Sequence, residues 1–298
     1  MTSAELSVVV PAVNAIDRIL ETLGALETQR PEVALEVLLV NRLGEPVSAT
    51  VRERFPLTRI LDVPAATPIP RMRALAFDAA TAPAVAVIED HVIVPPGWAR
   101  SLLRAQGEST PVVGGPVDNG ATSTTVDWAA FLCEYSACMP PLPAGATSWL
   151  PGNNVVYPRG LLERYRDVVA SGGWENRLHD ALRRDGIPLT MRPDLVVSHR
   201  MHYTAGLYLS QRFLYSRSFA ADRCQGATLA RRIGLAMASL LLPPVLLARI
   251  VSQVLAKGRY VGQLVKSLPL LVMFVVAWAA GEVTGTLAGA GDSLSKVR

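Results

Sequence analysis

The chain has 298 residues, of which 50% are hydrophobic and 18% charged, and it carries a formal net charge of +4. Soluble domains have roughly 25% charged residues, so the composition predicts that part of the chain lies in lipid. Basic residues do not form a block interleaved with aromatics, which argues against nucleic-acid binding.

The first half alternates between strand-like and helix-like segments. Strands are predicted at Leu6–Val10, Glu36–Val40, Arg59–Val63 and Ala84–Ile88, with helices at residues 16–29 and Pro70–Ala82. Unbroken apolar runs are typical of strands buried on both faces. The alternation therefore predicts an α/β fold with a mostly parallel sheet, whose ligands bind outside the carboxyl ends of its strands. The N-terminus lacks the features of a signal peptide, so we expect this half in the cytoplasm.

The second half is less regular. The pattern predicts strands at Val112–Gly115, Leu189–Met191 and Leu195–Ser198, helices at Asp127–Met139 and Trp174–Arg184, and a loop at Pro140–Gly152. After Arg232 the composition changes, and two apolar segments follow at about 233–248 and 267–290. The second is long enough to cross a bilayer, while the first is short and could span, re-enter or lie at the interface. A buried helical hairpin is the alternative for both.

Polar groups follow several of these strands or begin a helix. They are Pro11 with Asn14, the triplet Glu89-Asp90-His91, Glu175 with His179, and His199 with His202. A turn after the first strand could receive a nucleotide base. The carboxylates and imidazole of the triplet suit Mg²⁺ or Mn²⁺ bridging phosphates. Plainer explanations are a strand-end turn, a helix cap, a first-turn acid favoured by the helix dipole and solvated histidines.

Seven motifs occur in order along the chain. They are Val8–Asn14 (VVVPAVN), Arg73–Ala76, Glu89–His91, Pro95–Trp98, Pro151–Asn154, Trp174–Leu178 with Arg183–Gly186, and Val197–His199. In this order and spacing they resemble the family 2 glycosyltransferases with the GT-A fold, over roughly residues 5–225. The resemblance implies a GT-A domain at 1–225, with a nucleotide-sugar half (1–115), an acceptor half (116–205) and a juxtamembrane segment (206–225). A membrane-associated region at 226–298 would follow it.

The resemblance also implies roles for individual residues. Donor-binding residues would be Pro11, Asn14, Asn41, Arg73, Glu89 and Asp90, and acceptor-binding residues Gly152, Asn153, Asn154 and Trp174. A divalent ion, Mg²⁺ or Mn²⁺, would be held by Asp90, His91 and His199, and Glu175 would be the catalytic base. The chain departs from the family pattern where Asn41 replaces a base-binding aspartate, where Glu89 and His91 flank a single aspartate, and where Glu175 replaces the catalytic aspartate.

The implied activity is inverting transfer of a sugar from a nucleotide diphosphate to an acceptor hydroxyl. The aromatic and basic stretch Tyr208–Arg223 suits a headgroup layer, so we expect a lipid or lipid-linked acceptor at the cytoplasmic membrane face. Solvated arginines on a packed helix would explain the stretch equally well. The alternative function is an inactive membrane module that binds a nucleotide sugar or a partner. A nucleotidyltransferase is disfavoured, because no glycine- and lysine-rich pyrophosphate loop is present near the first strand.

Overall fold

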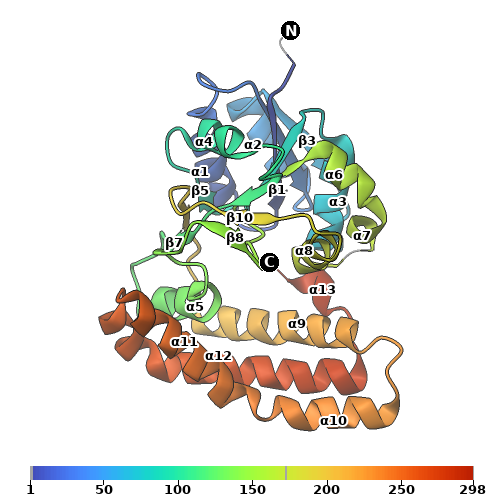
Figure 1. The fold of residues 1–298 in the computed structure, drawn as a ribbon, viewed down its shortest axis with the longest axis vertical. Helices are drawn as coiled ribbons and strands as arrows, with labels where there is room; N and C mark the ends of the chain where they lie inside the picture. The colour runs from blue at the N-terminus through green and yellow to red at the C-terminus, as the bar shows by residue number, and fades with distance from the viewer. Residues whose placement is uncertain (1–2, 172, 298) are drawn as a thin grey trace. The chain divides into compact units, whose positions relative to one another are not determined.

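A computed structural model describes residues 3–171 and 173–297 of the chain (Figure 1). These residues form two compact units. One comprises the chain up to Gly120 together with Cys138–Arg200, and we call it the sheet unit. The other comprises Ala121–Ala137 together with the chain from Met201 onward, and we call it the helical unit.

The sheet unit contains an eight-stranded sheet in the order β3-β2-β1-β4-β9-β6-β10-β8. Its strands are β1 (Leu6–Ala12), β2 (Leu35–Asn41), β3 (Thr58–Asp62), β4 (Ala84–Val87), β6 (Val112–Gly114), β8 (Gly145–Thr147), β9 (Val155–Pro158) and β10 (Leu189–Met191). The strand β1 pairs in parallel with β2 and β4, and β2 pairs in parallel with β3. Further along, β9 runs antiparallel to both β4 and β6. The predicted α/β class with a mostly parallel sheet is confirmed.

A second sheet joins three short strands in the order β5-β11-β7. They are β5 (Val92–Ile93), β7 (Val117–Asn119) and β11 (Val197–His199). In the antiparallel pairing of β5 with β11, His199 lies opposite Val92. The small sheet therefore brings the end of β11 next to the polar triplet that follows β4.

Helices surround the strands of the sheet unit (Figure 1). They are α1 (Ile16–Glu27), α2 (Glu45–Arg54), α3 (Ile69–Ala79), α4 (Trp98–Ala105), α6 (Arg159–Arg164), α7 (Arg166–Ala170) and α8 (Glu175–Arg184). On α1 the residues Ile19, Leu23 and Leu26 are buried at helical spacing, as the sequence pattern predicts. The predicted helix at Trp174–Arg184 begins one residue later, because Trp174 has the extended backbone of an N-cap.

The helical unit contains six helices within the described residues. They are α5 (Thr125–Tyr135), α9 (Ala205–Arg223), α10 (Leu229–Ser239), α11 (Leu242–Lys257), α12 (Val261–Ala288) and α13 (Ser293–Lys296). A capping box between Thr124 and Asp127 begins α5, so this helix starts before the predicted Asp127 and ends before Met139. Its Ala129 and Ala130 share a buried cluster with Tyr208 and Phe274.

One helix, α12, is long and apolar enough to cross a membrane, with a mean hydropathy of 1.9 over its best window. The α10 and α11 pair passes the same test only if the two helices count as one span, and a bend of 51° separates them. The expected division at residue 225 differs from the observed grouping, because α5 and α9 precede that residue but pack against α12.

Candidate active site

The centre of the site is a buried carboxylate that ties two strand ends together. Asp90 Oδ2 accepts hydrogen bonds from the backbone N–H groups of Val13 and Asn14 at 2.7 and 2.8 Å. Its Oδ1 accepts from Asn14 Nδ2 at 2.8 Å and contacts His91 Nδ1 at 2.9 Å. The neighbouring strands β1 and β4 thus end in turns that this one side chain joins.

Asp90 is fully buried but remains ionised. Burial alone would raise the pKa of its carboxyl, yet hydrogen bonds from His91, Asn14 and Val13 and the charge of His91 hold that pKa below its ordinary value. A carboxylate can only accept hydrogen bonds, so in a neutral ring His91 carries its proton on Nδ1 and presents the lone pair of Nε2. Asp90 therefore orients the imidazole of His91.

This imidazole and two neighbouring side chains can together hold a metal ion. Glu89, His91 and His199 each offer one ligand atom, and these atoms lie within 4.8 Å of one another. His91 Nε2 is 2.8 Å from His199 Nε2 and 3.5 Å from Glu89 Oε2. Burial and the charge of His91 hold the pKa of His199 well below its usual range, so its ring is neutral and can coordinate.

The donor set fits a divalent cation. Two facing Nε2 atoms can share at most one proton between them, and a cation would satisfy the lone pairs of both. A carboxylate behind a ligating imidazole, as Asp90 lies behind His91, is a common support for a bound metal. The prediction of His91 and His199 as ligands stays a prediction, as does that of Asp90. The geometry groups Glu89 with the two histidines, whereas both oxygens of Asp90 already have partners within the protein.

A turn explains this exchange of roles. Asp90 and His91 are its central residues, and a hydrogen bond from the backbone N–H of Val92 to the carbonyl of Glu89 at 3.1 Å closes it. Because no local sequence pattern reports which side chains of such a turn meet, sequence reasoning could not identify Glu89 as the partner of His91. The resemblance alone placed Glu89 among the donor-binding residues.

The predicted base lies in the same site, at the first turn of α8. Glu175 Oε2 accepts a hydrogen bond from Arg73 Nη1 at 2.7 Å. The Nη2 atom of the same guanidinium is 3.6 Å from Glu89 Oε1, and Glu89 also accepts from Asn153 Nδ2 at 2.9 Å. Arg73 is therefore a bridge between the predicted base and the candidate metal ligands.

Gly152 leaves the space that Glu175 occupies. A Cβ atom on this residue would overlap the Glu175 carboxyl carbon. Trp174, Arg73, Gly152 and Glu175 border a small cavity of about 30 Å³. Of the predicted acceptor-binding residues, Gly152 and Trp174 thus lie beside the predicted base.

Asn154 and Asn41 use their side chains within the protein. Asn154 Nδ2 donates to the carbonyls of Pro116 and Leu195, at 3.1 and 2.7 Å, and its Oδ1 accepts from Trp98 Nε1 at 3.1 Å. The donor-binding roles of Asn41 and Pro11 and the acceptor-binding role of Asn154 stay predictions.

Around Asn41, Nδ2 contacts Gly44, Ser48 and Asp62, and Oδ1 accepts from the backbone N–H of Leu43. These bonds fix the turn after β2.

His179 anchors the helix that carries Glu175. The ring Nε2 is 2.7 Å from the Tyr157 hydroxyl, and both side chains are buried. Burial lowers the pKa of His179 to about 4, although the charges of Glu175 and Asp180 raise it. Burial and the charge of Glu175 also raise the pKa of Tyr157. This neutral contact joins α8 to β9, one helical turn beyond Glu175.

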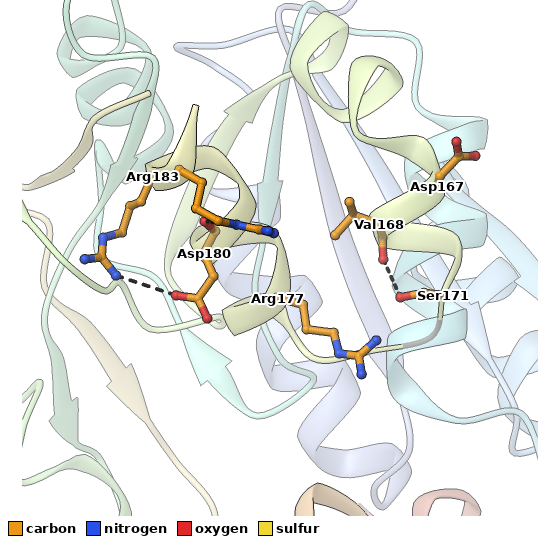
Figure 2. Close-up of a pocket in the computed structure, with 7 residues that line it drawn as sticks. Asp167, Val168, Ser171, Arg177, Asp180 and Arg183 are labelled. Atoms are coloured by element: carbon orange, nitrogen blue, oxygen red, sulfur yellow. Dashed lines mark hydrogen bonds and ion pairs between the residues drawn. The ribbon is translucent and has the colours of Figure 1, made fainter. Parts of the chain in front are cut away.

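A larger surface hollow of about 800 Å³ lies between α7 and α8 (Figure 2). It is lined by Asp167, Val168, Ser171, Arg177, Asp180, Arg183 and Arg184. Arg183 is 3.5 Å from Asp180, and Ser171 donates a hydrogen bond to the carbonyl of Val168 (Figure 2). The mixture of charges gives this hollow no clear preference for an anion.

Comparisons with known proteins bear on the family and on the fold. Residues 7–135 match the family described as Glycosyl transferase family 2. No curated protein sequence matches the chain. The fold is similar to that of the mannosyltransferase PcManGT from Pyrobaculum calidifontis, solved in complex with GDP-Man and Mn²⁺. That likeness has a TM-score of 0.55 and 17% identity, covering 94% of this chain and 87% of the other.

The fold is also similar to that of S. aureus TarS 1-349, with a TM-score of 0.51 and 12% identity over 94% of this chain and 90% of the other. The predicted GT-A fold is confirmed by these two likenesses.

Proposed function

Because residues 7–135 match the glycosyl transferase family 2, we propose that the protein is an inverting, metal-dependent hexosyltransferase. It moves a sugar from a nucleotide diphosphate donor to a lipid or lipid-linked hydroxyl at the cytoplasmic face of the membrane. One observation carries the proposal. Arg73 contacts both Glu175 and Glu89, so the predicted base and the candidate metal ligands belong to a single site.

The donor diphosphate would lie against Glu89, His91 and His199. These three residues would hold a divalent ion, which offsets the negative charge that develops on the leaving diphosphate. Asp90 keeps the turns after β1 and β4 together, and so places the backbone of Val13 and Asn14 beside the predicted donor site. A nucleotide donor and Mn²⁺ are what the similar structure of PcManGT contains.

Glu175 would take the proton from the attacking acceptor hydroxyl. A general base must lie within hydrogen-bond reach of that proton, and inversion requires it on the opposite side of the sugar from the leaving diphosphate. Arg73 holds the carboxylate in position by donating a hydrogen bond to Oε2. Trp174 and Gly152 border the same position, which supports acceptor binding there.

Membrane location is supported by α12, whose length and hydropathy suit a lipid environment. A lipid or lipid-linked acceptor would then lie in the same membrane as the enzyme. The cytoplasmic side is proposed because nucleotide sugars would be drawn from that compartment.

A decisive experiment combines donor turnover with donor binding. Purified protein with Mn²⁺ is given a panel of nucleotide sugars, and release of nucleoside diphosphate is measured with and without polyprenyl phosphate or glycolipid acceptors. We expect Glu175→Gln to lower transfer by about 10²- to 10⁴-fold while a donor still raises the melting temperature. The matched control is Glu163→Gln, at a glutamate on α6 that pairs with Arg159.

The second candidate function is a binding module without turnover. The internal hydrogen bonds of Asn41 favour it, because they occupy the side chain at the position where the family has a base-binding aspartate. Equal background turnover by wild type and Glu175→Gln with every donor, together with a donor-induced rise in melting temperature, would support the module instead.

A further inference from the structure

The long helix α12 is apolar on its outer face as well as on its inner one. Its buried face combines Leu271, Phe274 and Val275 with Ser267, Glu282 and Thr286, and its exposed face presents Val265, Val272, Met273 and Val276. A helix on the surface of a soluble protein instead turns polar residues towards water. Lipid is the solvent that matches an apolar outer face.

The buried face of α12 is covered along its length by α5 and α9 (Figure 1). Near its start, the ring of Trp128 on α5 lies 4.7 Å from that of Tyr260. Further along, Tyr208 of α9 lies 4.5 Å from Phe274, and the Arg212 guanidinium lies 4.1 Å above the ring of Trp278.

Towards the end of α12, its contact with α9 is closer still. A Cβ atom on Gly281 or Gly285 would overlap α9 at Phe213, Ser216 or Arg217. Arg217 Nε donates to the carbonyl of Gly289 at 2.9 Å, and Arg223 pairs with Glu282.

These contacts determine how α12 can enter a membrane. At about 1.5 Å per residue, a perpendicular α12 would carry α9 with it through the hydrocarbon. Arg212, Arg217 and Arg223 would then be spread across the bilayer at different depths, where charged side chains are costly. With α12 parallel to the membrane plane, α9 lies on its water side and all three arginines stay at headgroup level.

The bent pair α10 and α11 continues the same apolar surface. No charge occurs from Ile233 to Ala248, and Met237, Leu240, Leu241 and Val245 are exposed around the 51° bend. With 11 residues, α10 reaches only about 16 Å and cannot cross the bilayer. Arg231 and Arg249 lie on either side of the apolar stretch, both exposed, so basic groups flank it at both ends.

We propose that α10, α11 and α12 lie in the plane of a single leaflet rich in anionic lipid, with the bend around Leu240 and Leu241 inserted below the headgroups. The protein would then be monotopic, with both ends of α12 on the same side of the membrane. This inference deepens the membrane location of the proposed function, but its tests do not depend on sugar transfer. A loss of vesicle binding is therefore distinguishable from a loss of turnover.

The first test is binding of the full chain to vesicles by co-sedimentation. We expect wild type to bind vesicles of phosphatidylcholine and phosphatidylglycerol more tightly than phosphatidylcholine alone. Leu241→Glu should weaken binding at least about tenfold, since a buried leucine contributes that much or more. The matched control is Leu57→Glu, because Leu57 is 67% exposed on the sheet unit and Leu241 is 68% exposed. Circular dichroism checks that both variants fold.

Two results would overturn this part of the proposal. One is equal vesicle binding by Leu241→Glu and wild type. The other is a dimer in vesicle-free buffer that Leu241→Glu disperses, without vesicle binding by either protein, which would make a second copy of the chain the occupant of the surface.

The second test separates the in-plane arrangement from a spanning helix. Val261→Cys and Leu287→Cys place a thiol near either end of α12. The unmodified chain, in which Cys138 and Cys224 are buried and Cys133 is partly exposed, is the labelling blank whose signal is subtracted. Sealed inside-out membrane vesicles from expressing cells are treated with a membrane-impermeant maleimide before and after lysis. We expect both positions to react before lysis to the same extent. Reaction of only one position until the vesicles are lysed would show a spanning helix and overturn the proposal.

Discussion

Arg73 and Glu175 form a partly buried ion pair, in which Arg73 Nη1 lies 2.7 Å from Glu175 Oε2. The side chains are 8% and 22% exposed, so solvent screens the pair less than it would a surface pair. The contact links α3 to the first turn of α8, two elements that are far apart in the sequence. Arg73 also reaches Glu89, so it fixes the distance between the predicted base and the candidate metal ligands.

We predict that Arg73 cannot be replaced by lysine without loss of activity. A planar guanidinium contacts two carboxylates with separate nitrogens, whereas an ammonium is a single point charge. We expect turnover to fall about tenfold in Arg73→Lys and about a hundredfold in Arg73→Gln, because misplaced catalytic groups carry penalties of this size. Steady-state kinetics checks this, with the exposed Arg71→Gln on the same helix as the control. Full turnover by Arg73→Gln would contradict the prediction.

Gly152→Ala should remove activity without unfolding the protein. The new methyl group would overlap the carboxyl end of Glu175 and move it away from Arg73. A flexible side chain can give way at little cost, so we expect a loss of about a hundredfold in turnover with less than about 1 kcal/mol lost in unfolding free energy. Gly160→Ala is the matched control, because nothing lies within 4 Å of its Cβ position. Retained turnover in Gly152→Ala would argue against Glu175 as the base.

Sequence patterns identified the parallel half of the fold well. Leu6–Val10 and Ala84–Ile88 are continuous apolar runs, and such runs are typical of strands buried on both faces. The antiparallel strand β9 (Val155–Pro158) was missed, because four residues within an irregular region carry too little periodicity. The pairing of β9 with β4 and β6 is a long-range contact that no local pattern encodes.

The structure brings the predicted residues Glu89, Asp90, Glu175 and His199 together, and their roles stay predictions. Their mutual contacts could not be read from the sequence. That Asp90 would satisfy the backbone N–H groups of Val13 and Asn14 depends on how two turns meet in space. The bridge from Arg73 to Glu175 likewise depends on the packing of α3 against the end of α8, and no sequence signal reports it.

The candidate metal site should prefer Mn²⁺ over Mg²⁺. Two imidazoles and one carboxylate suit a transition-metal ion better than Mg²⁺, which favours oxygen ligands. We expect Glu89→Gln and His199→Ala each to weaken Mn²⁺ binding by about tenfold or more, as measured by calorimetry without donor. His202→Ala is the control, since His202 contacts Asp127 in the helical unit instead. Unchanged Mn²⁺ affinity in both site variants would show that the ion binds elsewhere.

Asp90→Asn should act mainly on stability. An asparagine amide would direct N–H groups towards the donors of Val13 or Asn14, leaving buried polar groups unpaired. We expect about 2–4 kcal/mol less unfolding free energy, the usual cost of disrupting a buried charged hydrogen-bond network. Chemical denaturation measures this against Asp180→Asn, at an exposed aspartate. A variant as stable as wild type but unable to bind Mn²⁺ would instead make Asp90 a direct metal ligand.

His179 should make the stability of the sheet unit depend on pH. Burial lowers the pKa of the folded-state imidazole to about 4, whereas an unfolded histidine titrates at about 6.5. Between these values the unfolded chain takes up a proton that the folded protein does not. The contribution of neutral His179 to the unfolding free energy is therefore fully present above about pH 6.5 and is lost as the pH drops towards 4. The contribution amounts to roughly 3 kcal/mol. His179→Gln removes this contribution, so the stability difference between wild type and this variant should shrink from pH 7 to pH 4.5 in denaturation experiments.

The control is Tyr157→Phe, which keeps the imidazole and should retain the wild-type pH dependence. An unchanged dependence of unfolding free energy on pH in His179→Gln would contradict the prediction.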